Sequence, residues 1–195
     1  MEKTAVLVGA GALGSHALLF ARNLPLRWVV VDFDRVEQKN VLAQLHPKGA
    51  LGKNKAEALR QTLLGLFGTK IEAIPHRLVP DNTAALLGRA DVVIDAVDNG
   101  ATRRLIQAFV REKGTPCLHA AASADGAYGR VVWDPIFRVD DEAVPGAATC
   151  EDGATLPFHG LVGAAVAGVL QRWLVDDVYE SLQVAASVVT VLDRR

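Results

Sequence analysis

Cysteine is scarce in this chain, since Cys117 and Cys150 are the only two among 195 residues. Two cysteines do not make a disulfide framework, and two so far apart cannot form the paired C-x-x-C motifs of a structural zinc site. An apolar segment surrounds Cys117, which we expect to be a small core residue. The pattern is typical of a protein of the reducing cytoplasm, and we expect no zinc.

An excess of one charge and a long apolar run are also lacking. Lysine plus arginine number 21 against 22 aspartates and glutamates, a net charge of −1. This balance does not favour nucleic-acid binding. The most apolar stretch, Leu161 to Leu170, is too short to span a bilayer, and we expect a buried core or dimer-interface helix there. The N-terminus runs directly into an apolar strand without the pattern of a signal peptide, so we expect a cytoplasmic protein with no membrane partner.

Strand and helix patterns alternate through the first two thirds of the chain, which predicts an α/β, Rossmann-like, doubly wound and mostly parallel sheet. A further strand, a helix and a final strand or hairpin follow, so we expect additional C-terminal strands. Residues 1–195 are predicted to form one nucleotide-binding domain, with a long crossover loop at about 134–158. The expected strands lie near 4–8, 27–32, 70–74, 91–95, 116–121, 129–133 and 182–192. The expected helices lie near 12–23, 53–67, 82–88, 101–113 and 160–175.

The most informative segment is the glycine-rich turn after the first strand, VLVGAGALGS at 6–15. Gly9, Gly11 and Gly14 form a G-x-G-x-x-G pattern between a strand and a helix. In such a turn the first glycine permits the tight bend, the second lets the backbone approach a phosphate, and the third lets the helix pack closely. Asp32 ends the second strand, at about the separation along the sequence from the glycine turn at which an acid binds a ribose hydroxyl in such folds. A nucleotide site is therefore predicted, although a turn that serves only helix packing remains the alternative.

Four ordered segments together resemble the ubiquitin-activating-enzyme-like superfamily that contains ThiF, MoeB and HesA. DFDRVEQKN at 32–40 is similar to the family's D-x-D-x-V-x-x-x-N, and LGKNKAE at 51–57 to its G-x-x-K-A-E segment. DVVIDAVDNGATR at 91–103 and TCEDG at 149–153 are similar to its aspartate and cysteine segments. The resemblance covers nearly the whole chain. It implies adenylation, with ATP and Mg²⁺, of the C-terminal carboxylate of a small ubiquitin-like or sulfur-carrier protein.

The resemblance also implies a role for each matching residue. Gly9 and Gly11 would line the nucleotide, Asp32 would hold the ribose hydroxyls, and Asn40 and Lys55 would contact the phosphates. Asp98 would hold magnesium, while Asn99 and Arg103 would shape that corner. With Gly14 and Asp34 added, and with Asp98 kept apart as the metal ligand, the predicted cofactor-binding residues are Gly9, Gly11, Gly14, Asp32, Asp34, Asn40, Lys55, Asn99 and Arg103. The predicted catalytic residues are Lys55, Asp98 and Cys150.

Several of these residues have plain structural alternatives. Lys55 alone would be a solvated lysine of a helix, Asp98 could cap the N-terminus of the next helix, and Asp34 could bond backbone groups within its turn. Cys150 matches a family position that forms a thioester or carries sulfur, but Glu151 and Asp152 disfavour its thiolate form, so an inert thiol is the alternative. His119 ends a strand on the ligand side of the sheet, where a site role is possible.

Two departures from the family pattern bear on catalysis. Family members usually have arginine three positions after the asparagine, whereas Ala43 stands there in this chain. The N-terminal extension that reaches the partner subunit's ATP in many members is absent from this sequence. Removing one charge-stabilising donor commonly costs about 10²–10³ in rate. We therefore expect a homodimer or heteromer in which a partner could supply an arginine.

Three functions are compatible with these observations. The first is an adenylyltransferase of the activating-enzyme type. The second, favoured by Ala43, is a non-catalytic ATP-binding subunit of such a pathway. The third is an NAD-dependent oxidoreductase, which Asp32 alone allows, but Lys55 and the Asp98–Asn99 pair argue against it.

Overall fold

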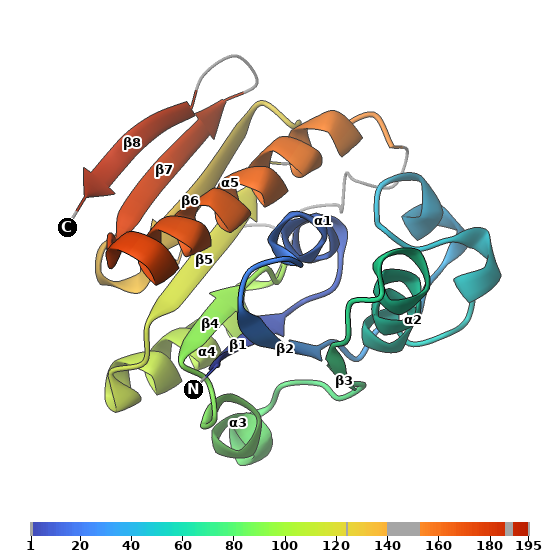
Figure 1. The fold of residues 1–195 in the computed structure, drawn as a ribbon, viewed down its shortest axis with the longest axis horizontal. Coiled ribbons are helices and arrows are strands. Elements are labelled where there is room, and N and C mark those ends of the chain that lie inside the picture. The colour runs from blue at the N-terminus through green and yellow to red at the C-terminus, as the bar shows by residue number, and fades with distance from the viewer. Residues whose placement is uncertain (1, 124, 140–152, 186–188, 195) are drawn as a thin grey trace.

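One eight-stranded sheet organises the computed structural model, which describes residues 2–123, 125–139, 153–185 and 189–194. Its strand order is β3-β2-β1-β4-β5-β6-β7-β8 (Figure 1). The strands from β3 to β5 in this order pair in parallel, and β6, β7 and β8 add antiparallel strands at one side. The predicted α/β fold with a mostly parallel sheet and additional C-terminal strands is therefore confirmed.

The helices and strands follow the predicted alternation, with small shifts of their ends. The strands are β1 Lys3–Val8, β2 Leu26–Val31, β3 Glu72–Ile74, β4 Val92–Asp95, β5 Cys117–Ala122, β6 Tyr128–Trp133, β7 Glu180–Ala185 and β8 Val189–Arg194. The α-helices are α1 Ala12–Ala21, α2 Lys55–Phe67, α3 Pro80–Leu87, α4 Gly100–Lys113 and α5 Leu156–Asp176. Short 3₁₀ helices are η1 Gln38–Leu42, η2 Lys48–Ala50 and η3 Asp134–Ile136.

Both faces of the parallel strands are buried, because successive side chains of a strand point to opposite faces. On one face, Leu7, Val30 and Ile94 join a core with buried residues of α1, α2 and α5. On the other face, Val8 and Val93 pack with buried residues of α3 and α4, and Cys117 belongs to this core as expected. Figure 1 shows the same arrangement, with α1, α2 and α5 on one side of the sheet and α4 on the other.

The order of the strands determines where ligands can bind. β1 lies between β2 and β4, so the chain leaves β1 toward one side of the sheet and later returns on its other side. Open α/β sheets bind ligands at such a switch point, beyond the carboxyl ends of the strands. The glycine turn follows β1, Asp32 follows β2, and Asp98 follows β4. All three segments therefore meet at one edge of the sheet.

The helix predicted at 160–175 is longer than the sequence suggested, since α5 spans 21 residues, Leu156–Asp176. The stretch Leu161 to Leu170 was expected to be too short for a bilayer, but the whole helix is long and apolar enough by length and composition alone. Its buried side chains, however, belong to the core: Phe158, Val162, Val166, Val169, Leu170 and Trp173. Gly163 of α5 allows close contact with α1, because a Cβ there would lie 2.8 Å from the Cβ of His16. These contacts support the expected core helix.

The crossover loop predicted at about 134–158 contains regular structure at both ends. It begins with η3 and ends with the first residues of α5. Residues 140–152 lie outside the part of the chain that the structure describes, and Cys150 is among them.

Candidate functional site

The three glycines of the turn occupy three different environments. Gly9 has φ +96°, and a Cβ there would lie 2.7 Å from the carbonyl oxygen of Ala96. A Cβ on Gly14 would lie 1.8 Å from the carbonyl oxygen of Gly9, which leaves no room for any side chain. A Cβ on Gly11, at the N-terminus of α1, would meet only Gln44 Nε2 among the described residues, at 4.0 Å. The backbone at Gly11 is thus open on the side where an anion could approach the helix amides and dipole.

Asp32 joins the glycine turn to the end of β2. One carboxylate oxygen accepts a hydrogen bond from the backbone amide of Ala10 at 2.6 Å, and the other from the amide of Asp34 at 2.8 Å. Burial raises the pKa of Asp32, while the two amide donors and nearby Lys55 lower it. Because both amides donate, the geometry suits the ionised form. Asp32 therefore fixes the turn as well as standing at the predicted ribose position.

Lys55 forms an ion pair with Asp34 at the start of α2. Its Nζ lies 2.9 Å from the Asp34 carboxylate, and only 11% of the lysine side chain is exposed against 46% for the aspartate. Asn54 caps α2 by accepting from the amide of Glu57, and its Nδ2 donates to the carbonyl oxygens of Asp32 and Asp34. The alternative of a solvated Lys55 is wrong. The lysine is buried and held beside Asp32, with an acidic partner.

Asn40 lies in a segment that is tied to the glycine turn. Its Oδ1 accepts from the amide of Glu37 at 2.8 Å, which closes the first turn of η1. Further along, the Ser15 hydroxyl accepts from the amide of Leu45, and the His46 ring nitrogen Nε2 lies 2.9 Å from the carbonyl oxygen of Ala10. Burial lowers the pKa of His46 to about 4, so its ring is neutral at pH 7. A neutral ring donates from Nε2 and keeps Nδ1 as an acceptor.

Ala43 stands three positions after Asn40, where the family pattern has arginine. Ala43 is fully buried, so the position of the missing arginine is closed to solvent. Gln44 follows, with its Nε2 facing Gly11 and its buried Oε1 without a hydrogen-bond partner among the described residues. Sequence analysis gave Gln44 no role. Only its place beside the asparagine motif could have drawn attention to it.

The Asp98 corner lies against the glycine turn, since the chain after β4 is the segment that blocks a Cβ on Gly9. Asp98 itself is exposed. Asn99, and not Asp98, caps α4, because its Oδ1 accepts from the amide of Thr102 at 2.9 Å. The alternative role of Asp98 as the cap is therefore wrong, and its carboxylate is left for other partners. Arg103 donates to the carbonyl oxygens of Val97 and Ala120, so its role within the described residues is to fix this turn.

Behind this corner lies a buried charged network that sequence analysis missed. His119 Nδ1 lies 2.7 Å from the Asp95 carboxylate, and His119 Nε2 lies 3.2 Å from the Asp134 carboxylate. Arg111 and Gln107 of α4 also donate to Asp134, at 2.7 and 2.8 Å. His119 was predicted only as a possible site residue, and Asp134 only as the start of a loop. No local pattern marks Asp134, because its partners come from α4 and β5.

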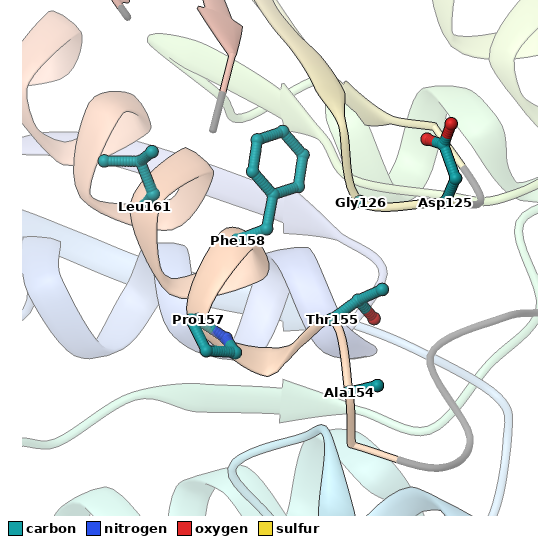
Figure 2. A pocket seen from close by; sticks show the side chains of 7 residues that line it. All are labelled: Asp125, Gly126, Ala154, Thr155, Pro157, Phe158 and Leu161. Carbon is teal, nitrogen blue, oxygen red and sulfur yellow. The ribbon is translucent and has the colours of Figure 1, made fainter. Parts of the chain in front are cut away.

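A pocket of about 230 Å³ lies beside the start of α5, on the same edge of the sheet as the glycine turn. In Figure 2, Asp125 and Gly126 line it from the turn between β5 and β6, while Thr155, just before α5, and Phe158 of α5 line its other side. Ser123 and the amide of Ala127 donate to Asp125 and lower its pKa, so the pocket carries a fixed negative charge.

The described part of the site thus brings a helix N-terminus, a buried lysine and an exposed aspartate to one edge of the sheet. The lysine and the helix amides suit phosphate groups. Magnesium is commonly held by one or two carboxylates together with phosphate oxygens, and Asp98 offers such a carboxylate. The donor set therefore fits a nucleoside triphosphate with its magnesium.

Comparison with known proteins agrees with this geometry. Residues 2–190 match the ThiF family. The chain is 32% identical over 171 residues to the SAMP-activating enzyme E1 of Haloferax volcanii, covering 85% of this chain and 63% of that protein. It is 28% identical over 159 residues to the probable adenylyltransferase/sulfurtransferase MoeZ of Mycobacterium tuberculosis, covering 80% of this chain and 37% of that protein.

Among solved structures, the fold is similar to that of E. coli MccB in its crystal structure with ATP. The TM-score is 0.71 at 15% sequence identity, over 99% of this chain and 63% of that one. The chain thus spans less than two thirds of the length of these relatives. Because the family match extends over nearly all its residues, the chain belongs to the ThiF family.

Proposed function

We propose that this chain catalyses ATP-dependent adenylation of the C-terminal carboxylate of a small ubiquitin-like or sulfur-carrier protein. The observation that carries the proposal is the meeting of open Gly11, buried Lys55 and exposed Asp98 at the switch point of the sheet. Two relatives support it by name, one as a SAMP-activating enzyme and the other as a probable adenylyltransferase/sulfurtransferase. E. coli MccB, which shares the fold, was crystallised with ATP.

In the proposed reaction, a carboxylate oxygen of the carrier attacks the α-phosphorus of ATP and pyrophosphate leaves. The products are an acyl-adenylate and pyrophosphate. Asp32 would hold the ribose hydroxyls, Asn40 would contact the phosphates, and the amides at Gly11 would face a phosphate. Lys55 would offset negative charge as the carboxylate approaches, since charge stabilisation and positioning are most of what such a transfer requires.

Asp98 would hold the magnesium ion, with Asn99 and Arg103 keeping its turn in place. Bound magnesium neutralises phosphate charge and orients the leaving pyrophosphate. The proposal predicts ATP–pyrophosphate exchange when the purified chain meets its cognate carrier, which is best sought among proteins encoded beside it. ATP binding without exchange, for every such carrier, would contradict the adenylation step.

Ala43 favours a second candidate, a non-catalytic ATP-binding subunit. The family arginine is replaced, and the alanine in its place is fully buried. In a homodimer or a heteromer, the partner subunit could supply the missing positive charge. We place the protein in the cytoplasm. Sedimentation analysis with and without ATP and carrier measures the oligomeric state. ATP–pyrophosphate exchange by this chain with its carrier, but without a partner subunit of another kind, would exclude the non-catalytic function.

Cys150 lies outside the described residues, and its role as a thioester or sulfur carrier is a separate proposal. Cys150→Ala should leave ATP–pyrophosphate exchange intact, because adenylation precedes any thiol chemistry. The same substitution should abolish a reductant-sensitive adduct between the chain and the carrier. An adduct that survives the substitution would assign Cys150 as an inert thiol.

A further inference from the structure

His119 is fully buried between two carboxylates from different elements. Asp95 ends β4 and lies 2.7 Å from Nδ1, whereas Asp134 begins η3 and lies 3.2 Å from Nε2. The Phe137 ring stacks on the imidazole at 4.0 Å between centroids, with 5° between the ring planes. An ionised carboxylate only accepts hydrogen bonds, so the ring meets both partners only if both of its nitrogens carry a proton.

The charges around the ring fit this doubly donating form. Burial works to lower the pKa of His119, but its charge interaction with Cys117 and its hydrogen bonds to Asp134, Asp95 and Cys117 raise it above its ordinary value. The pKa of Asp134 is lowered to about 2, since its hydrogen bonds to His119 and Arg111 outweigh its burial. Arg103 Nε lies 3.8 Å from the Asp95 carboxylate. The buried carboxylates are thus balanced by an imidazolium and by arginines of α4.

One arm of this network leads to the magnesium corner. Asp95 Oδ1 accepts from the amide of Val97 at 3.1 Å, and Val97 immediately precedes Asp98. The carbonyl oxygen of Val97 accepts from Arg103. The amide of Ala96 donates to the carbonyl oxygen of Val8 at 2.9 Å, which sets the turn against the strand that leads into Gly9. The Asp95 carboxylate therefore helps to fix the chain that carries Asp98, together with Arg103 and the amide of Ala96.

The other arm leads away from the site. Asp134 is held by Gln107 and Arg111 on the side of α4 that faces η3. None of the described contacts of Asp134 involves residues 96–99 or the glycine turn. The two ring nitrogens of His119 thus serve different ends: Nδ1 faces the turn that carries Asp98, and Nε2 anchors the ring to η3.

We propose that His119 is a positioning residue for the proposed adenylation site, which holds the Asp95–Asp98 turn through its Nδ1 donor so that Asp98 can bind magnesium. The role rests on the proposed function, because it requires an ATP–magnesium site at Asp98. His119 touches neither nucleotide nor metal in this scheme. It acts only through Asp95 and the amide of Val97.

Two substitutions separate the arms. Asparagine places an amide nitrogen near the position of Nδ1, so His119→Asn keeps a donor for Asp95. Glutamine places one near the position of Nε2, so His119→Gln keeps a donor for Asp134 and loses the one for Asp95. Both variants remove the ring and its charge, which makes each the matched control of the other. Arg111→Gln weakens only the far arm.

The measurement is calorimetric ATP binding over a range of Mg²⁺ concentrations, with melting temperatures recorded for each variant. The magnesium concentration that gives half of the affinity gain should rise about 10-fold or more in His119→Gln, the usual cost of losing a partner that orients a ligand. It should stay within about 3-fold of wild type in His119→Asn and Arg111→Gln. A role in folding alone would lower both His119 melting temperatures without separating their magnesium dependence.

The outcomes distinguish this role from the proposed function. If the wild-type chain binds no ATP, the proposed function fails and the role fails with it. The positioning role alone is overturned if magnesium increases ATP affinity equally in all folded variants. It is also overturned if this increase is reduced by the same factor in both His119 variants. Nitrogen NMR of the wild-type ring at pH 8 adds a test without substitution. Two protonated ring nitrogens support the role, and a neutral ring overturns it.

Discussion

The two sides of the candidate site are held together in different ways. On the glycine-turn side, side chains are held mainly by hydrogen bonds to backbone groups: Asp32 accepts from two amides, and Asn54 donates to two carbonyl oxygens. On the Asp98 side, buried side chains hold one another, with His119 between Asp95 and Asp134. Removing one partner of a buried charged network leaves an uncompensated charge, whereas an amide can find water or another acceptor. The Asp98 side is therefore the more sensitive to the loss of a charged side chain.

The largest effect on folding is expected from the glycine turn itself. Gly14→Ala would place its Cβ 1.8 Å from the carbonyl oxygen of Gly9, a backbone atom that cannot move without unfolding the turn. We expect a loss of about 3 kcal/mol or more in the free energy of unfolding, or no folded protein. Gly11→Ala is the matched control, because within the described parts of the chain a Cβ there would meet only Gln44 Nε2, at the 4.0 Å limit.

Gly11→Ala should therefore fold with a melting temperature near that of wild type, and it should bind ATP more weakly, because the methyl group occupies the open side of the turn. Urea unfolding and calorimetry give the two quantities. Equal stability of the two alanine variants would show that the turn is looser than its geometry indicates.

The next largest effect is expected on the rate of ATP–pyrophosphate exchange, when one of the two predicted catalytic charges is removed. One of these charges lies on each side of the site. Lys55→Ala and Asp98→Ala should each lower ATP–pyrophosphate exchange by about 10²–10³ or more. Arg60→Ala is the control for Lys55, since Arg60 lies on the same helix and its ion pair is with partly exposed Glu57. Full exchange in either variant would refute the role assigned to that residue.

The difference between the two sides also explains what could be predicted from the sequence. Gly9, Asp32 and Lys55 lie in motifs whose spacing fixes their place after a strand or at the start of a helix, so their meeting at one edge follows from the fold. Asp134 has no such motif, and its partners are known only once α4 packs beside β5. Helix lengths were less predictable than helix positions. The ends of α5 became clear only from its packing on α1.

The pH dependence of stability should also differ between the two sides. His46 has an ordinary pKa of 6.5, which burial lowers to about 4 in the folded chain. Protons therefore bind preferentially to the unfolded chain, so stability falls as the pH drops from 6.5 toward 4, by an amount on the order of 3 kcal/mol. On the Asp98 side, the pKa of His119 is raised. Its contribution is fully present below pH 6.5 and is lost only as the pH rises toward the raised value.

His46→Gln keeps a donor for the carbonyl oxygen of Ala10 and removes the titrating group. Its unfolding free energy should fall less steeply than that of wild type between pH 6.5 and 4, as followed by urea unfolding at several pH values. Identical acid slopes in wild type and His46→Gln would assign the acid loss to other groups.

The smallest expected effect separates capping from ligand binding at Asn99. Its Oδ1 caps α4 by accepting from the amide of Thr102, so Asn99→Ala should cost about 1 kcal/mol of stability. Asn99→Ser restores a capping oxygen but not the amide group. If the cap is the whole role, serine recovers both the stability and the ATP affinity that alanine loses. If serine recovers stability while ATP affinity stays low, the Asn99 amide contacts the nucleotide, and the Asp98 side then contributes binding groups as directly as the glycine turn does.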